Sequence, residues 1–144
     1  MNELRKRAIA LLARREHSRA ELAAKLTALG SREEIDAVLA ELTESGLLSD
    51  ARYAEAYLRS NATRFGAGRL RQTLRRKGID GDLIEAKLAG ADAPDELARA
   101  RAVWARKYAA APQDAKEWAR QARFLQGRGF STDVIRRLLK EPTP

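Results

Sequence analysis

The stretch of this sequence best suited to chemistry is RFGAGRLRQTLRRKGID, residues 64–80, because cationic side chains dominate it. Six of them precede the first acid, Asp80: Arg64, Arg69, Arg71, Arg75, Arg76 and Lys77. An arginine guanidinium group grips a phosphate or a carboxylate through two parallel hydrogen bonds. The chemistry expected of this stretch is therefore the binding of a polyanion.

Helical periodicity places these cations on one side of an element. At 100° per residue, Leu70, Leu74 and Ala67 fall within a 60° stripe, and the arginines occupy the arc opposite. We expect the stripe to be buried and the cations to be exposed. Gly66 and Gly68 are predicted to leave backbone N–H groups accessible to an anion at the start of this helix.

A sparser set of cations follows near the C-terminus. Arg120, Arg123 and Arg128 are the further candidates for polyanion binding. Glu117 and Asp133 lie close enough in sequence to neutralise part of this charge, so an ordinary helix surface is an equally good interpretation.

Residue types needed for catalysis or metal binding are scarce. The sequence has one histidine and no cysteine, which argues against a zinc site. We expect His17 to lie in a surface turn, and no phosphate-binding loop motif is present. The sequence predicts no enzyme, no cofactor and no small-molecule substrate.

Aromatic side chains recur at helical spacing. Tyr53 and Tyr57, like Trp104 and Tyr108, stand four residues apart, which is typical of a core stripe, although stacking on nucleic-acid bases is the alternative. Four further aromatics are expected to pack between helices: Phe65, Trp118, Phe124 and Phe130.

The elements that position these residues are predicted to be helices arranged in three repeats. Three L-x-x-x-G helix endings finish at Gly30, Gly78 and Gly129, 48 and then 51 residues apart. Each is followed by a pair of apolar residues four apart, which begins another helix. The expected fold is all-α, with about nine helices in an elongated, curved array of three-helix repeats at residues 1–48, 49–91 and 92–144. The expected helix N-caps are Ser18, Ser31, Ser49 or Asp50, and Ser131.

Charge is distributed unevenly over these repeats. The 28 basic and 20 acidic residues of the chain give a net charge of +8, of which residues 1–49 contribute 0 and residues 50–91 and 92–144 contribute +4 each. No apolar run approaches the length of a membrane span or of a signal-peptide core. We expect a soluble cytoplasmic monomer that makes no contact with membranes.

Four stretches together resemble one protein family. ARREHSRAELAAKL (13–26), GLLSDARYAEAYLRS (46–60), GAGRLRQTLRRKGI (66–79) and RFLQGRGFSTDVIRRLL (123–139) are similar, in order and spacing, to the signatures of the RecX family of bacterial RecA regulators. One departure is Ser49, which stands where the family usually has the first residue of an acidic pair.

The resemblance implies a molecule that lies in the groove of a RecA–single-stranded DNA filament and inhibits ATP hydrolysis, strand exchange and filament growth. It implies RecA and single-stranded DNA as partners, with duplex DNA bound more weakly. The basic residues named above are then candidates for contact with filament DNA or with acidic RecA surface.

Two other functions remain open from the residues alone. SRAELAAKLTALG (18–30) is typical of the first helix and turn of a helix-turn-helix transcription regulator, but the following helix begins with Glu33 and Glu34, which would repel phosphates. A protein–protein adaptor with incidental basic charge is the third possibility.

Overall fold

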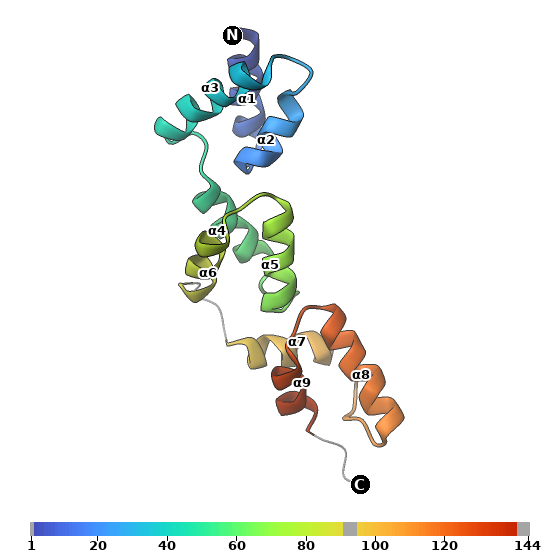
Figure 1. The fold of residues 1–144 in the computed structure, drawn as a ribbon. Helices are drawn as coiled ribbons and strands as arrows, with labels where there is room; N and C mark the ends of the chain where they lie inside the picture. Colours follow the sequence, from blue (N-terminus) through green and yellow to red (C-terminus); the bar gives the residue numbers. More distant parts are fainter. Residues whose placement is uncertain (1, 91–94, 141–144) are drawn as a thin grey trace. The chain divides into compact units, whose positions relative to one another are not determined.

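The chain is helical throughout the residues that the structure describes, 2–90 and 95–140 of a computed structural model (Figure 1). Within these ranges there is no strand, and nine helices follow one another, as the sequence predicts. Their bounds are α1 Asn2–Arg14, α2 Arg19–Leu26, α3 Arg32–Glu44, α4 Asp50–Asn61, α5 Ala67–Arg76, α6 Gly81–Ala89, α7 Glu96–Lys107, α8 Ala115–Gly127 and α9 Thr132–Leu139.

Helix starts are set locally by side chains that accept hydrogen bonds from the first unpaired N–H groups. Ser18 and Ser31 form capping boxes with Glu21 and Glu34, and the Ser131 hydroxyl accepts from the Val134 N–H. The Ser49 hydroxyl accepts from the Arg52 N–H, which assigns the fourth cap to Ser49. The predicted caps are confirmed.

In two of the three repeats, the second helix is closed by the predicted glycine. Gly78 and Gly129 have positive φ values of 81° and 95°, the left-handed conformation that closes a helix without a Cβ penalty. Gly30 does not share this conformation and follows a turn after α2. The common L-x-x-x-G pattern therefore conceals two different helix endings.

The nine helices group into two compact units, each with its own internal packing. The N-terminal unit contains residues 1–57 and 74–89, and the C-terminal unit contains residues 58–73 and 90–144. Parts of α4 and α5 therefore belong to different units. The three-repeat boundaries at 1–48, 49–91 and 92–144 stay a prediction. The sequence also predicts a joint between repeats at residues 89–96, which lies partly outside the described residues, and fraying of residues 141–144, which lies wholly outside them.

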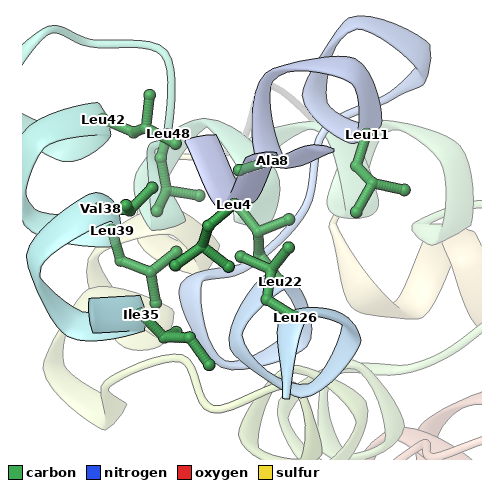
Figure 2. Close-up of a cluster of buried hydrophobic side chains, with 10 residues drawn as sticks. All are labelled: Leu4, Ala8, Leu11, Leu22, Leu26, Ile35, Val38, Leu39, Leu42 and Leu48. Carbon is green, nitrogen blue, oxygen red and sulfur yellow. The ribbon is translucent and has the colours of Figure 1, made fainter. Parts of the chain in front are cut away.

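The first repeat is built around an aliphatic core. Figure 2 shows Leu4 of α1 pointing between the leucines of α2 and the buried face of α3. Leu22 and Leu26 are fully buried, and Leu48 closes the cluster after α3. Burying one such side chain contributes about 1.5–3 kcal/mol. The remaining members of this cluster are Ala8, Leu11, Ile35, Val38, Leu39 and Leu42.

The N-terminal unit also contains a joint between the first and second repeats. The Ser18 hydroxyl donates a hydrogen bond of 2.7 Å to the Lys77 carbonyl at the end of α5. A Cβ atom at Gly78 would lie only 2.6 Å from the Ala20 Cβ, so α2 and the end of α5 approach as closely as glycine permits. The start of α2, the second helix of the first repeat, thus lies against the end of α5, the second helix of the second repeat.

The C-terminal unit repeats this joint with different residues. The Gly66 N–H donates to the Arg128 carbonyl at 2.8 Å, and the Gly68 N–H donates to the Gly129 carbonyl at 3.1 Å. The prediction that these two N–H groups are accessible to an anion is therefore wrong. They are occupied because the turn between α8 and α9 packs against the start of α5, a long-range contact that helical periodicity does not report.

The third repeat has a separate core with polar groups embedded in it. Val103, Leu125 and Ile135 come from α7, α8 and α9 and are buried together. Gln121 is 1% exposed, and its carbonyl accepts a 2.7 Å hydrogen bond from the Trp104 indole N–H. This bond satisfies the polar edge of an aromatic residue that otherwise packs against the core.

The prediction that His17 lies in a surface turn is wrong, because the residue is only 1% exposed. Its Nδ1 atom lies 3.0 Å from the Arg15 carbonyl, which can only accept, so Nδ1 carries the proton. Nε2 then offers its lone pair to the Lys25 ammonium group, also at 3.0 Å. Burial lowers the pKa of His17, and the charges of Arg15 and Lys25 act in the same direction.

Candidate nucleic-acid interface

The cations predicted on α5 have different surroundings. Leu70 and Leu74 are fully buried, as expected of the apolar stripe. Arg75 and Arg76, in the last turn, are exposed. Arg71 is half-buried and engaged with other groups of the protein. The helix therefore presents a smaller set of solvent-facing cations than the sequence suggests.

Lys77 is drawn into an ion-pair network of the N-terminal unit. Its Nζ atom lies 3.5 Å from a carboxylate oxygen of Glu21, which also receives two hydrogen bonds of 3.1 Å from the Arg15 guanidinium group. Burial acts to raise the pKa of Glu21, but these hydrogen bonds and the two positive charges outweigh it and hold the pKa below its ordinary value. Lys77 thus has a structural role at the joint.

The candidate residues on α8 separate into two groups. Arg120 forms a salt bridge of 3.5 Å with Glu117, as the sequence suggests, and both side chains line a recess with Asp114, Lys116 and Arg123. Two acids offset two of its three cations and leave a formal charge of +1 in this recess. Arg128 lies elsewhere, at the C-cap of α8.

Three of the predicted cations gather around one buried aromatic ring in the C-terminal unit. Phe65 is 8% exposed, and the guanidinium carbons of Arg69, Arg64 and Arg128 lie 4.2, 5.3 and 5.6 Å from its ring centroid. These are cation–π distances. The Arg69 guanidinium group also donates to the Gly127 carbonyl at 3.2 Å, which fixes it across the joint.

Beside this cluster lies an open cleft of about 490 Å³, which we name the Phe124 cleft. Four of its lining residues are cations and two are apolar. The lining residues are Arg64, Val103, Arg106, Lys107, Phe124 and Arg128.

The cations of the Phe124 cleft come from three separate segments. Arg64 lies in the turn after α4, Arg106 and Lys107 form the end of α7, and Arg128 caps α8. The Arg128 backbone is anchored because its carbonyl accepts from Gly66. Helix C-termini carry partial negative charge and so favour cations at these two helix ends.

Aromatic rings are interleaved with these cations. Lys107 Nζ lies 4.4 Å from the Phe124 ring centroid, and the Arg128 guanidinium carbon lies 5.5 Å from it. Tyr108 meets Phe124 edge-on at 5.6 Å and stacks on Trp104 at 6.4 Å. Phe124 and Tyr108 are both half-buried, and Phe124 lines the cleft.

Sequence reasoning missed the contribution of Arg106 and Lys107. They stand between Trp104 and Tyr108, in a run of cations and aromatics that could have been identified as a basic patch. Phe124 was expected only to pack between helices. Arg106 and Lys107 meet Arg128 through the packing of α7 against α8, and the joint between the start of α5 and the α8–α9 turn adds Arg64.

Other kinds of site receive no support from the described residues. Within residues 2–90 and 95–140, no three His, Cys, Asp or Glu side chains are grouped to hold a metal ion. No helix in that part of the chain is both long enough and apolar enough to cross a membrane.

Comparison with known protein families assigns all three repeats. Residues 5–42 match the RecX first three-helix domain, residues 49–88 match the second, and residues 94–139 match the third. The expected order of three three-helix repeats is confirmed.

Curated relatives and solved structures agree with this assignment. Regulatory protein RecX of Leptothrix cholodnii is 49% identical over 138 residues, covering 95% of this chain and 87% of its own length. Regulatory protein RecX of Chromobacterium violaceum is 45% identical, covering 94% and 88%. The crystal structure of RecX from Lactobacillus salivarius, at 21% identity, shares the fold with a TM-score of 0.81 over 96% of this chain and 94% of that one. The chain belongs to the RecX family of regulatory proteins.

Proposed function

We propose that this protein regulates the RecA recombinase by binding in the groove of the RecA–single-stranded DNA filament, where it inhibits ATP hydrolysis, strand exchange and filament extension. The observation that carries the proposal is the family match over all three repeats. The protein acts as a cytoplasmic monomer, without a cofactor or a small-molecule substrate.

Exposed cations supply the contacts to the filament. Arg75 and Arg76 at the end of α5 and Arg123 on α8 point into solvent and form no salt bridge within the described residues. They can meet DNA phosphates or acidic RecA side chains at little desolvation cost, because the contact stays near water. Lys77 and Arg71 contribute mainly by holding α5 in place.

The alternative function, sequence-specific transcription regulation, finds no comparable support. Glu34 is committed to the capping box with Ser31 at the start of α3, which is where a recognition helix would contact base edges. Two exposed acids in the first turn, Glu33 and Glu34, would face DNA phosphates there. Strong preference for one duplex sequence would restore this alternative.

The test is inhibition of the single-stranded-DNA-dependent ATPase of RecA. The double variant Arg75→Glu/Arg76→Glu should require about tenfold more protein for half-inhibition, since two contacts to anions become repulsive. Lys6→Glu/Arg7→Glu is the matched control, because these adjacent, exposed cations of α1 undergo the same charge change.

The outcome distinguishes three cases. Inhibition that weakens for the α5 variant alone supports the proposal. Equal weakening in both variants would mean that only net charge matters, and the surface assignment would be wrong. Absence of any effect of the unaltered protein on RecA would refute the proposed function itself.

A further inference from the structure

We infer that the Phe124 cleft is a binding site for single-stranded nucleic acid, in which the cations hold backbone phosphates and Phe124 receives a base. This inference deepens the proposed function and rests on it for its biological setting. By this inference the chain binds a single strand in the absence of RecA.

The first argument is the uncompensated charge of the cleft. Arg64, Arg106, Lys107 and Arg128 bring four positive charges to one recess, and none of them forms a salt bridge within residues 2–90 and 95–140. The C-termini of α7 and α8 together offset about one elementary charge, at about one half each. A charge of about +3 remains, and an anion with more than one negative group is the ligand that relieves it.

The second argument is the aromatic surface that lies among the cations. An inorganic anion or an acidic peptide would use the charges of the cleft but would have no use for the half-buried ring of Phe124 that lines it. A single-stranded nucleic acid uses both, because its bases stack on aromatic rings while its phosphates meet cations. The Lys107 ammonium group lies 4.4 Å from the Phe124 centroid. A base that stacks on Phe124 would displace this group, which would then move to a phosphate.

The third argument is shape. A recess of about 490 Å³ falls in the range of about 300–1,000 Å³ that encloses a small organic ligand. It can admit an unstacked nucleotide of a single strand, whereas the bases of a duplex are stacked and cannot enter it. The ligand class is therefore a flexible single strand, in keeping with a filament that carries one.

The fourth argument is preorganisation. Arg128 is held from its backbone, because its carbonyl accepts the Gly66 N–H, and its guanidinium carbon lies within 5.6 Å of both the Phe65 and the Phe124 centroids. Arg64 is held over Phe65 at 5.3 Å. Two of the four cations are thus positioned before a ligand arrives, which lowers the entropic cost of binding.

The experiment measures binding of a fluorescein-labelled oligothymidylate to the full chain by anisotropy over a range of salt, without RecA. Arg106→Gln/Lys107→Gln should weaken binding about tenfold and make the slope of log affinity against log salt shallower by about 1.4, at about 0.7 per phosphate of a single strand. The control Arg101→Gln/Lys116→Gln removes one arginine and one lysine from exposed positions on the same two helices, α7 and α8. It should leave both quantities close to those of the unaltered protein.

A second variant tests the base. Phe124→Leu keeps an apolar side chain in the third-repeat core but removes the ring, and it should weaken binding of oligothymidylate about fivefold or more. The same variant should bind an abasic oligonucleotide of equal length as well as the unaltered protein does, because that ligand has phosphates only. Circular dichroism of each variant checks that the helices are retained.

Several results would overturn the inference. One is an equal loss of affinity for oligothymidylate in the Arg106/Lys107 variant and in its control. Another is the absence of any binding of the bare oligonucleotide by the unaltered protein. Equal loss of oligothymidylate and abasic binding in Phe124→Leu would overturn the base contact. RecA ATPase inhibition is measured in parallel. If the unaltered protein inhibits RecA but does not bind the bare oligonucleotide, the nucleic-acid site in the Phe124 cleft is refuted and the proposed function is not.

Discussion

The close approach of α5 to the α8–α9 turn can be tested by adding one methyl group. In Gly66→Ala the new Cβ atom would lie 2.6 Å from the Gly129 carbonyl carbon and oxygen and 2.7 Å from Phe130 Cδ1. Backbone atoms cannot swing away as a flexible side chain can. The turn must therefore move as a whole relative to the start of α5.

The size of the effect follows from the hydrogen bonds that hold this joint. Reaching an ordinary contact of 3.4 Å requires a shift of about 0.8 Å. The same shift along the Gly66 N–H to Arg128 carbonyl bond would lengthen it from 2.8 Å to about 3.6 Å, beyond hydrogen-bonding distance. Losing one or two such bonds at about 1 kcal/mol each, with residual overpacking of about 1–3 kcal/mol, gives a loss of about 2–5 kcal/mol in unfolding free energy.

Urea denaturation followed by tryptophan fluorescence measures this loss where it occurs. Both tryptophans, Trp104 and Trp118, belong to the C-terminal unit. The transition midpoint should fall by about 1–2.5 M urea for a slope of about 2 kcal/mol/M. Gly127→Ala is the matched control, since nothing lies within 4 Å of its added Cβ and the residue is helical, so a gain of up to about 1 kcal/mol is expected. An unchanged midpoint for Gly66→Ala, or an equal fall for both variants, would refute the reasoning.

Two further predictions concern the N-terminal unit. Ser18→Ala removes both the α2 cap and the hydrogen bond to the Lys77 carbonyl. It should lower the unfolding free energy, measured by urea titration, by about 2–3 kcal/mol. A loss under about 1 kcal/mol would mean that water replaces the hydroxyl as the donor to this carbonyl. The pKa of His17 is lowered in the folded protein from 6.5, so its contribution to stability is complete above pH 6.5 and is lost as the pH falls below it. His17→Gln, which keeps an acceptor for Lys25, should therefore flatten the dependence of unfolding free energy on pH just below 6.5, and an unchanged profile would show that His17 does not cause it.

The fold could be predicted from the sequence to the extent that its determinants are local. The serine caps of α2, α3 and α9 satisfy N–H groups three residues away, so their spacing is visible in the sequence. The buried pair Leu70 and Leu74 follows from helical periodicity alone. These features need no knowledge of any other part of the chain.

The candidate site was predictable only in part. Arg64 and Arg128 were identified as cations with a binding role to be tested, but their neighbours Arg106 and Lys107 were not. Lys77 was grouped with solvent-facing cations, although Glu21, distant in sequence, pairs with it. His17 was expected at the surface because its neighbours are polar, yet the packing around it excludes water.

The sequence by itself determined that this protein is helical, repeated and basic, because helix propensity, caps and charge are properties of residues and of their near neighbours. The tertiary structure alone decided which charges act together. Arg64 shares the Phe124 cleft with Arg106, Lys107 and Arg128 because glycine at positions 66 and 129 allows two backbones to approach within hydrogen-bonding distance. Contacts of this kind depend on positions about 60 residues apart, and no local pattern specifies them.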